Sequence, residues 1–185
     1  MRPQKVQDIQ MLNGLMSVFR AKGYDGASLS ELATATGLKK ASLYHRFPGG
    51  KKDMTSAVLT YLNDWVYQNI NGVLLDDSKS KNQRLVEVVE GIKEVYKDGT
   101  EICLYRSLSL DSGIDLFGNL IREGINQWIE AFKVFGLEKG MTETVALENA
   151  YQTFIDIQGS LVLSKTMDST THFLNMLEKI KERYT

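Results

Sequence analysis

The sequence predicts an all-α protein of about nine helices, and three observations support this fold class. Apolar residues recur every three or four positions along most of the 185-residue chain, the spacing that gives a helix one buried face. Glycines and helix-capping residues stand where these periodic segments begin or end. The one ambiguous stretch, residues 100–113, has no visible partner strand elsewhere in the chain, so we expect helix and loop there too.

The first helix is expected over residues 5–22, where apolar residues follow helical spacing, and Gly23 should end it. The second helix should begin at Ser28. This serine and Glu31 have the spacing of a capping box, in which each side chain accepts a hydrogen bond from the other residue's backbone amide. Gly37 stands where a left-handed residue would end this short helix.

A third helix is expected to begin at Lys39 or Lys40. Leu43 and Phe47 are four positions apart and can both face inward, and residues 48–50, Pro-Gly-Gly, stop the helix. The other side chains should point outward and form a basic face rich in hydrogen-bonding groups: Lys40, Ser42, Tyr44, His45 and Arg46.

Two short helices joined by a glycine turn form a helix-turn-helix, a motif whose second helix enters the major groove of DNA. A compact helical hairpin with solvated charges is the alternative, because the bare arrangement is common. The charge distribution favours DNA: residues 1–56 carry nine Lys and Arg against four Asp and Glu, whereas the remainder carries thirteen against nineteen. We therefore expect a basic N-terminal module that meets polyphosphate.

The residues from Ala21 to Met54 resemble the DNA-binding domain of the TetR family of transcriptional repressors. In that family a tyrosine near the end of the recognition helix and a lysine that begins the fourth helix touch backbone phosphate. The resemblance assigns these roles to Tyr44 and to Lys51 or Lys52. The positions that carry the resemblance are Gly23, Tyr24, Leu32, Ala33, Gly37, Ser42, Leu43, Tyr44, His45 and Phe47.

The loop after the recognition helix is one residue longer than the commoner form and is similar to that of the LmrA/YxaF-like subgroup. This extra residue leaves open which of the two lysines contacts phosphate. The candidate DNA-binding residues are Ser28, Lys39, Lys40, Ser42, Tyr44, His45, Lys51 and Lys52.

Five longer helices are expected in the rest of the chain, over about residues 53–71, 85–96, 114–135 and 142–165, and from residue 168 or 169 onward. Gly99 and Gly136 should end the second and third of these, and Thr142 should cap the fourth. A polar loop is expected over residues 75–82. We expect two domains: a helix-turn-helix DNA-binding domain over residues 1–52 and a larger effector-binding and dimerisation domain over residues 53–185.

The penultimate helix is apolar on more than one side, so it must be covered by its own domain or by a second chain. The resemblance implies a homodimer in which the last two helices of each subunit form a four-helix bundle. Such a dimer would hold two recognition helices about 34–36 Å apart and would bind a palindrome. The candidate interface residues are Tyr151, Ile157, Gly159, Leu161, Phe173, Met176 and Leu177.

Large aromatic residues in the C-terminal part could line a small-molecule site or could simply be core. Small-molecule pockets place a few polar groups among apolar walls. The resemblance implies an effector cavity among these helices, and the subgroup suggests a small hydrophobic or aromatic effector. The candidate lining residues are Trp65, Tyr96, Cys103, Phe117, Trp128, Phe154 and Gln158.

Nothing in the sequence indicates an enzyme, a cofactor or a metal site. The two histidines, His45 and His172, lie far apart, and no metal-binding, nucleophile or phosphate-loop motif is present. The single cysteine, Cys103, is better explained as a buried small side chain than as a redox sensor. No apolar run resembles a signal peptide or a membrane span, so we expect a cytoplasmic protein.

These observations predict a homodimeric DNA-binding transcriptional regulator, a repressor that a small-molecule effector releases from a palindromic operator. The alternative is a helix-turn-helix DNA-binding dimer without a small-molecule effector, controlled by a protein partner or by its own abundance.

Overall fold

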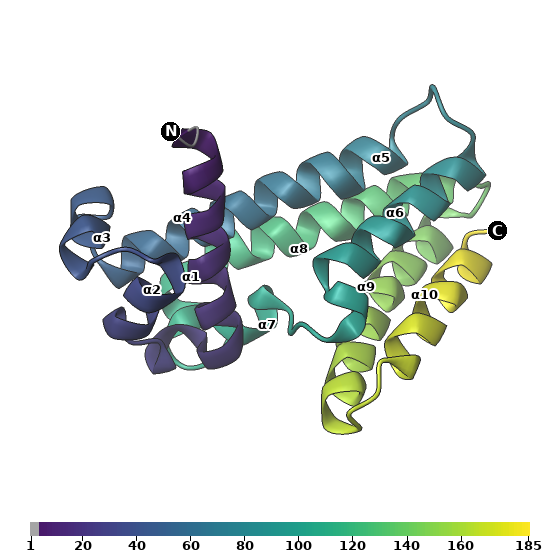
Figure 1. Cartoon of the computed structure of the whole chain (residues 1–185). Helices are drawn as coiled ribbons and strands as arrows, with labels where there is room; N and C mark the ends of the chain where they lie inside the picture. The colour runs from purple at the N-terminus through teal and green to yellow at the C-terminus, as the bar shows by residue number, and fades with distance from the viewer. Residues whose placement is uncertain (1–3) are drawn as a thin grey trace. The chain divides into compact units, whose positions relative to one another are not determined.

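The computed structural model describes residues 4–185, with side chains from residue 8 onward. In this part of the chain α4 (Lys51–Val66), the π-helical turn η1 (Tyr67–Asn71) and α5 (Gly72–Leu74) follow one another without a break. Counted together as one helix, they bring the described residues to nine helices and no strands, and the all-α prediction is confirmed (Figure 1). None of these helices is long and apolar enough to cross a membrane. The elements are α1 (Gln4–Gly26), α2 (Leu29–Thr36), α3 (Lys40–Arg46), α4 (Lys51–Val66), η1 (Tyr67–Asn71), α5 (Gly72–Leu74), α6 (Lys81–Val95), η2 (Lys97–Gly99), α7 (Leu104–Leu108), α8 (Ser112–Glu138), α9 (Glu143–Thr166) and α10 (Thr171–Arg183).

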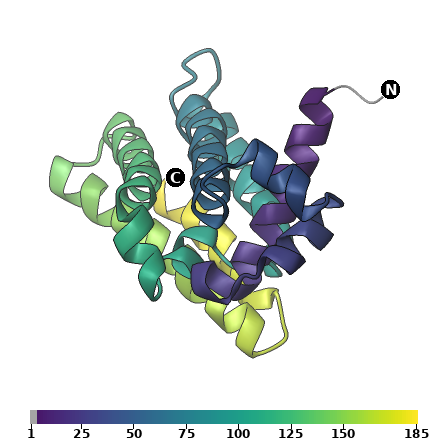
Figure 2. The ribbon, with the colours of Figure 1, turned by 90° about the vertical axis from the view of Figure 1, so that its left-hand side faces the viewer.

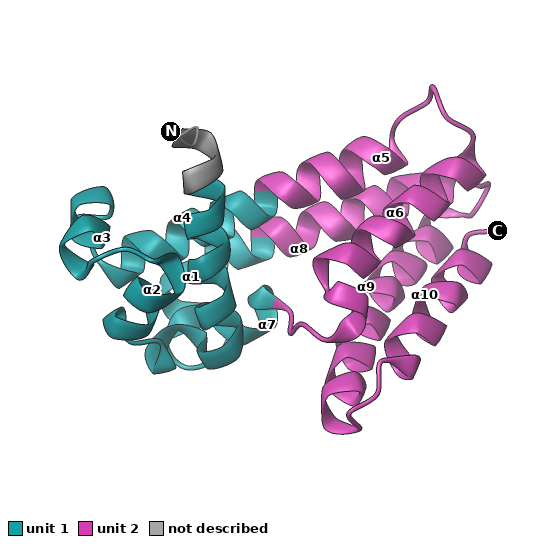
Figure 3. Cartoon of the chain, viewed as in Figure 1, with its two compact units in different colours: residues 1–63, 104–122 teal, residues 64–103, 123–185 magenta. Residues whose placement is uncertain are grey.

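The chain folds into two compact units, each built from two separate stretches of sequence (Figure 3). Unit 1 comprises residues 1–63 and 104–122, and unit 2 comprises residues 64–103 and 123–185. Unit 1 therefore contains α7 and the first part of α8 in addition to the N-terminal helices. The predicted boundary after residue 52 divides the chain by function and remains a prediction.

In unit 1, α1 packs against both α2 and α7. The helical course of α1 breaks at Gly23, which has φ 67° and ψ −170°, where the sequence predicts the helix to end. At Gly14 the backbones of α1 and α2 approach so closely that a Cβ would lie 2.4 Å from the carbonyl oxygen of Ala35. The Ser107 hydroxyl of α7 donates to the carbonyl of Arg20 at 2.8 Å. Together these contacts make α1 the scaffold on which α2 rests.

In unit 2, α9 and α10 lie side by side, as the two views of the ribbon show (Figures 1 and 2). The side chain of Tyr184, just after α10, is completely buried against the rings of Phe132 and Phe135. Burial raises the pKa of this phenol to about 12, and its hydroxyl lies 3.3 Å from that of Thr153 on α9. The C-terminal residues thus close the core of unit 2.

The predicted end of α8 and the predicted start of α10 are wrong. Gly136 does not end α8, because the helix continues to Glu138. A Cβ at Gly136 would lie 3.1 Å from the Cβ of Ala146, so this glycine permits a close approach, and the left-handed residue that follows the helix is Gly140, with φ 89°. The last helix begins at Thr171 instead of residue 168 or 169. The predicted cap of α9 is confirmed, since Thr142 accepts a hydrogen bond from the amide of Val145.

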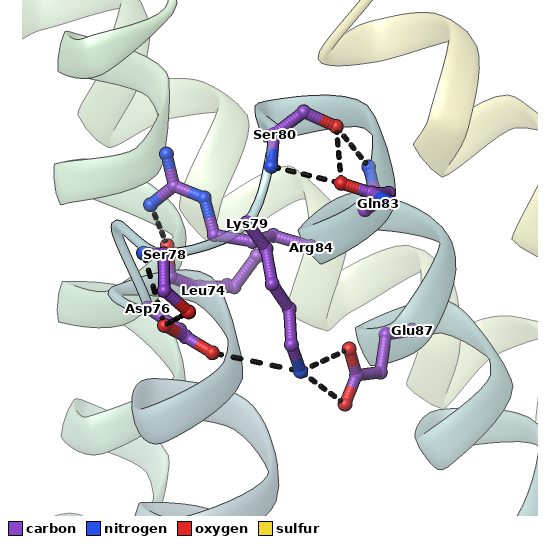
Figure 4. Close-up of polar contacts among 8 residues, drawn as sticks. All are labelled: Leu74, Asp76, Ser78, Lys79, Ser80, Gln83, Arg84 and Glu87. Carbon is purple, nitrogen blue, oxygen red and sulfur yellow. Dashed lines mark hydrogen bonds and ion pairs between the residues drawn. The ribbon is translucent and has the colours of Figure 1, made fainter.

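The connection between α5 and α6 is a short, highly bonded turn (Figure 4). Ser80 and Gln83 form a capping box that starts α6 at Lys81, so the predicted loop over residues 75–82 is two residues too long. The ammonium of Lys79 bridges Glu87, at 2.7 Å, and Asp76, at 3.5 Å.

Arg84 joins three elements of unit 2. Its buried guanidinium donates to the carbonyl of Leu74 at 2.5 Å and to the carboxylate of Glu138 at 2.7 Å, and it lies 5.5 Å from the ring centroid of Phe135 (the Leu74 bond is drawn in Figure 4). Arg84 therefore ties the end of α5 and the end of α8 to the first turn of α6.

Candidate nucleic-acid interface

The predicted helix-turn-helix forms in unit 1, and its start is fixed by the expected capping box. Ser28 Oγ accepts from the amide of Glu31, and the carboxylate of Glu31 accepts from the amide of Ser28 at 3.1 Å. A hydrogen bond from the Lys22 ammonium, together with those from Ser28, lowers the pKa of Glu31 to about 2. The Ser28 hydroxyl is already bonded to Glu31. The role of Ser28 that the structure shows is therefore to cap α2.

The turn between the two helices has the predicted geometry. Gly37 is left-handed, with φ 66° and ψ 17°, and its amide donates to Thr34. The amide of Leu38 then donates to the carbonyl of Ala33 at 3.1 Å. Both bonds satisfy carbonyls that the end of α2 would otherwise leave unpaired.

Helix α3 is held by one buried side chain, Leu43. The half-buried Phe47 follows the helix, as its predicted spacing with Leu43 requires. All other side chains of α3 are exposed, and they include four of the predicted DNA-binding residues: Lys40, Ser42, Tyr44 and His45. Lys39, directly before the helix, is exposed as well. The structure therefore places five of the predicted residues on one short, outward-facing element.

A cleft of about 510 Å³ lies between the start of α2 and the start of α4. Tyr44 forms one wall, and its ring packs against Gly50, where a Cβ would lie 3.2 Å from a ring carbon. Gly50 is left-handed, with φ 66°, so a side chain at this position would strain the turn and crowd the tyrosine ring. The lining residues are Ala27, Ser28, Leu29, Tyr44, Pro48, Gly49, Gly50 and Lys51.

The two lysines at the start of α4 have different surroundings. Lys52 is exposed, whereas the ammonium of Lys51 turns inward toward the carbonyls of Ala27, at 3.1 Å, and Asp25, at 3.5 Å. Sequence periodicity could not distinguish them, because the partners of Lys51 are backbone carbonyls about 25 positions away in the chain.

Arg46 is a basic residue of α3 that the sequence analysis placed on the outer face but not among the DNA-binding residues. Its guanidinium pairs with Asp8 of α1 at 2.5 Å. This ion pair fixes the end of α3 to α1. Only the tertiary arrangement brings the two residues together, and no local pattern indicates the pair.

Some of the predicted effector-binding residues come together in unit 2. Trp128 and Phe154 meet edge to face with ring centroids 6.0 Å apart, and Gln158 follows Phe154 by one helical turn. The indole nitrogen of Trp128 and both amide atoms of Gln158 are buried and have no hydrogen-bond partner among the described residues.

The other predicted effector-binding residues are placed differently. Phe117 belongs to unit 1, where it packs edge to face on Tyr24 at 5.1 Å. Tyr96 is buried against Phe173, Cys103 is buried, and Trp65 is half-buried. No group of three or more His, Cys, Asp or Glu among the described residues could hold a metal ion.

The predicted dimer-interface residues divide into two sets. Tyr151 and Gly159 are exposed on α9, and Met176 is half-buried. The remaining four are buried in the core of unit 2: Ile157, Leu161, Phe173 and Leu177. The large apolar side chains that α9 does expose are Val145, Leu147, Tyr151, Ile155, Val162 and Leu163.

Comparison with known proteins agrees with this geometry. The sequence profile described as "Bacterial regulatory proteins, tetR family" matches residues 12–58, which include the whole helix-turn-helix. The chain belongs to the TetR family. It is a transcriptional regulator with a helix-turn-helix DNA-binding domain, and the relatives that it matches are transcriptional regulators.

Two relatives of this TetR-family chain in Bacillus subtilis align over nearly the whole sequence. The regulator LmrA is 21% identical over 90% of each chain, and YxaF is 24% identical over 92% of this chain and 91% of its own. The negative regulator IcaR of the Staphylococcus aureus biofilm operon is 34% identical over 65 residues, 34% of this chain and 35% of its own.

Solved structures share the fold. A TetR regulator from Legionella pneumophila superposes with a TM-score of 0.80 at 21% identity, over 98% of this chain and 97% of its own. The TetR-family regulator CifR, solved with a 26-bp operator duplex, superposes with a TM-score of 0.70 at 20% identity over the full length of both chains.

Proposed function

We propose that this TetR-family regulator is a homodimeric repressor that binds a palindromic operator through α3 and leaves it when a small molecule binds unit 2. The observation that carries the DNA-binding part is the exposure of every α3 side chain except Leu43. A seven-residue helix held by one leucine presents its polar groups outward, as a major-groove helix must. IcaR, which is similar over 65 residues, about a third of this chain, is a negative regulator.

The outer face of α9 supports the dimer. Ile155 is 57% exposed and Tyr151 is 51% exposed, at a spacing of four residues, so they lie on one face of the helix. Gly159 follows at the next turn, and a Cβ there would meet nothing within 4 Å. An exposed apolar strip beside a small residue suits close packing against a second copy of α9. We therefore assign the interface to this strip, with the four buried residues supporting it from within.

The pair Trp128 and Gln158 supports an effector site in unit 2. Buried polar atoms are nearly always hydrogen-bonded, so unpartnered ones require an explanation. A small molecule with one donor and two acceptors would satisfy the indole nitrogen of Trp128 and both amide atoms of Gln158, and the ring of Phe154, which meets Trp128 edge to face, would contact its apolar part. The effector acts if it binds more tightly to the conformation that fits the operator less well, because only this difference in affinity shifts the population.

The alternative is a DNA-binding dimer with no small-molecule effector. It would be favoured if the atoms of Gln158 and Trp128 were satisfied by permanently bound water, which buried polar groups commonly hold. Control would then come from a protein partner or from abundance.

The test of DNA binding is a salt series with the duplex upstream of the protein's own coding region and a random duplex of equal length. We expect tight, salt-dependent binding to the first at two protomers or more per site. Tyr44→Phe should weaken binding to both duplexes, whereas Ser42→Ala should weaken only the specific one.

Ile155→Asp should give monomers in sedimentation and abolish specific binding. Equal affinity for all duplexes, including those recovered by selection from a random pool, would contradict the proposal.

The effector site is tested through Trp128, one of two tryptophans in the chain. In a Trp65→Phe background its fluorescence reports compounds that reach the site, and these compounds should release the operator duplex. Gln158→Leu should lower their affinity about tenfold, the value of one lost hydrogen bond of about 1.4 kcal/mol. If compounds that release DNA leave Trp128 fluorescence unchanged, the effector site lies elsewhere.

A further inference from the structure

A row of polar side chains lies beside the apolar strip of α9, which consists of Tyr151, Ile155 and Gly159. The polar row consists of Gln152 and Asp156, which are one helical turn apart. Each of them directly follows a member of the strip in sequence, so the two rows are neighbours along the helix. Gln152 is exposed and Asp156 is half-buried. A chain that packs on the strip would therefore also cover the polar row.

Both carboxylate oxygens of Asp156 are bonded to side chains of the same chain. The side-chain amide of Gln152 donates to Oδ1 at 2.7 Å, and the guanidinium of Arg183, at the end of α10, donates to Oδ2 at 2.5 Å. The second terminal nitrogen of Arg183 donates to the hydroxyl of the buried Thr153 at 2.9 Å. The side chains of Arg183 and Asp156 are only 17% and 18% exposed. The charge of Asp156 is therefore neutralised by an arginine of its own chain.

Neutralisation within one chain is what a surface patch requires if it is to meet a second copy of itself. In a two-fold interface the same patch of both copies takes part, so an unpaired carboxylate in the patch would be buried twice. Burying an unpaired charge costs far more than burying a charge that is paired and hydrogen-bonded. A different partner could supply a cation of its own to meet Asp156. The pairing of Asp156 with Arg183 therefore favours a second copy of this chain as the occupant of the strip.

We propose that Arg183 is a positioning residue of the dimer interface, which neutralises Asp156 and so allows the α9 strip to be buried against a second copy. The inference rests on the proposed homodimer. The guanidinium has a second role, because its bond to Thr153 ties the end of α10 to the inner side of α9. The bond to Thr153 stabilises the folded chain, whereas the neutralisation of Asp156 stabilises the dimer. The two roles can therefore be separated by experiment.

The dissociation constant of the dimer, measured by analytical ultracentrifugation of the full chain, tests the proposal. Arg183→Met leaves the Asp156 carboxylate unpaired and should weaken the dimer at least about thirtyfold, the effect of truncating one partner of a buried charge pair. Adding Asp156→Asn to this variant removes the unpaired charge and should recover most of the loss. Lys181→Met is the matched control, because Lys181 also lies in the last turn of α10 but pairs with Glu178, whose side chain is 65% exposed. It should leave the dissociation constant nearly unchanged.

Recovery in the double variant is the decisive result, since both variants that carry Arg183→Met lack the bond to Thr153. A double variant that dimerises as weakly as Arg183→Met would leave Arg183 only its structural role and overturn the inference. Equal dissociation constants for Arg183→Met and a dimeric wild type would also overturn it. A wild-type chain that stays monomeric at every concentration would instead contradict the proposed homodimer itself.

Two milder variants decide the question if circular dichroism shows that Arg183→Met does not fold. Arg183→Lys keeps a cation beside Asp156 and should dimerise nearly as well as the wild type. Asp156→Asn alone leaves the charge of Arg183 unpaired and should dimerise more weakly. The reverse order of the two dissociation constants would overturn the inference.

Discussion

The helix-turn-helix of unit 1 and helix α9 of unit 2 expose opposite kinds of surface. Helix α3 is seven residues long, buries only Leu43 and otherwise presents polar and basic groups. Helix α9 is 24 residues long, and beside its buried face it exposes apolar side chains such as Ile155 and Val162. The first surface suits a polyanion and the second suits another apolar surface. Helix α3 buries only Leu43, so its position depends on the helices next to it. Helix α9 has apolar side chains on two sides, so its position depends on packing against both sides.

The difference predicts that the first unit depends most on the fit of α1 and α2. Gly14→Ala would place a Cβ 2.4 Å from the backbone oxygen of Ala35, and neither backbone can move without separating the helices. We expect a loss of about 3 kcal/mol in the free energy of unfolding, at the upper end for overpacking, together with lost DNA binding. Urea unfolding measures the first effect and a duplex titration the second.

Gly91→Ala in α6 is the matched control, because a Cβ at Gly91 meets nothing within 4 Å. Replacing this helical glycine should raise stability by up to about 1 kcal/mol. If the two alanine variants unfold at the same urea concentration, the close contact at Gly14 does not determine the packing of α1 on α2.

Unit 2 should depend instead on buried polar connections between its helices. Arg84→Met removes the donor to the Leu74 carbonyl and the ionic partner of Glu138. Because Glu138 keeps some contact with solvent, we expect a loss of about 2 kcal/mol, less than for a fully buried pair. Thermal unfolding monitored by circular dichroism measures it.

Lys79→Met provides the control for Arg84→Met. Lys79, in the turn before α6, also forms an ion pair, with Glu87, but both of these side chains are accessible to water. A surface pair of this kind contributes at most about 1 kcal/mol. A larger loss from Lys79→Met than from Arg84→Met would mean that the turn and not the buried guanidinium holds α6.

The same comparison explains how far the sequence could be interpreted. Unit 1 uses local signals: the capping box of Ser28 and Glu31, the left-handed Gly37 and the spacing of Leu43 and Phe47 all form as predicted. These signals involve residues within five positions of one another, so sequence spacing determines them. The exposed face of α3 follows from the same spacing: Leu43 faces the core, so the other side chains of α3 point toward solvent.

The errors arise where partners are distant in the chain. Gly136 resembles a helix end, but Ala146 packs against it and the helix continues. Ile157 is as apolar as Ile155, and only the packing of α9 decides that the first is buried and the second exposed. The inward turn of Lys51 depends on the carbonyls of Asp25 and Ala27. Periodicity shows that a residue lies on an apolar face, but it does not identify which partner covers that face.

The smallest expected effect tests whether those local signals stabilise unit 1. Hydrogen bonds from Lys22 and Ser28 lower the pKa of Glu31 from 4.5 to about 2. A carboxylate with a depressed pKa in the folded protein stabilises it fully above its unfolded pKa and loses that contribution as the pH falls through the folded value. Stability should therefore decline between about pH 4.5 and pH 2 partly through Glu31.

Glu31→Gln keeps an acceptor for the amide of Ser28 but does not titrate, so the variant should lose less stability than the wild type over this acid range. Chemical unfolding at a series of pH values measures the difference, and Asp77→Asn, an exposed carboxylate in the α5–α6 turn, serves as the control. Parallel stability curves for Glu31→Gln and wild type would show that the cap forms without contributing to acid stability. The helix-turn-helix would then be held by Leu43 and by the contact at Gly14, and its local signals would direct where the helices begin without stabilising them.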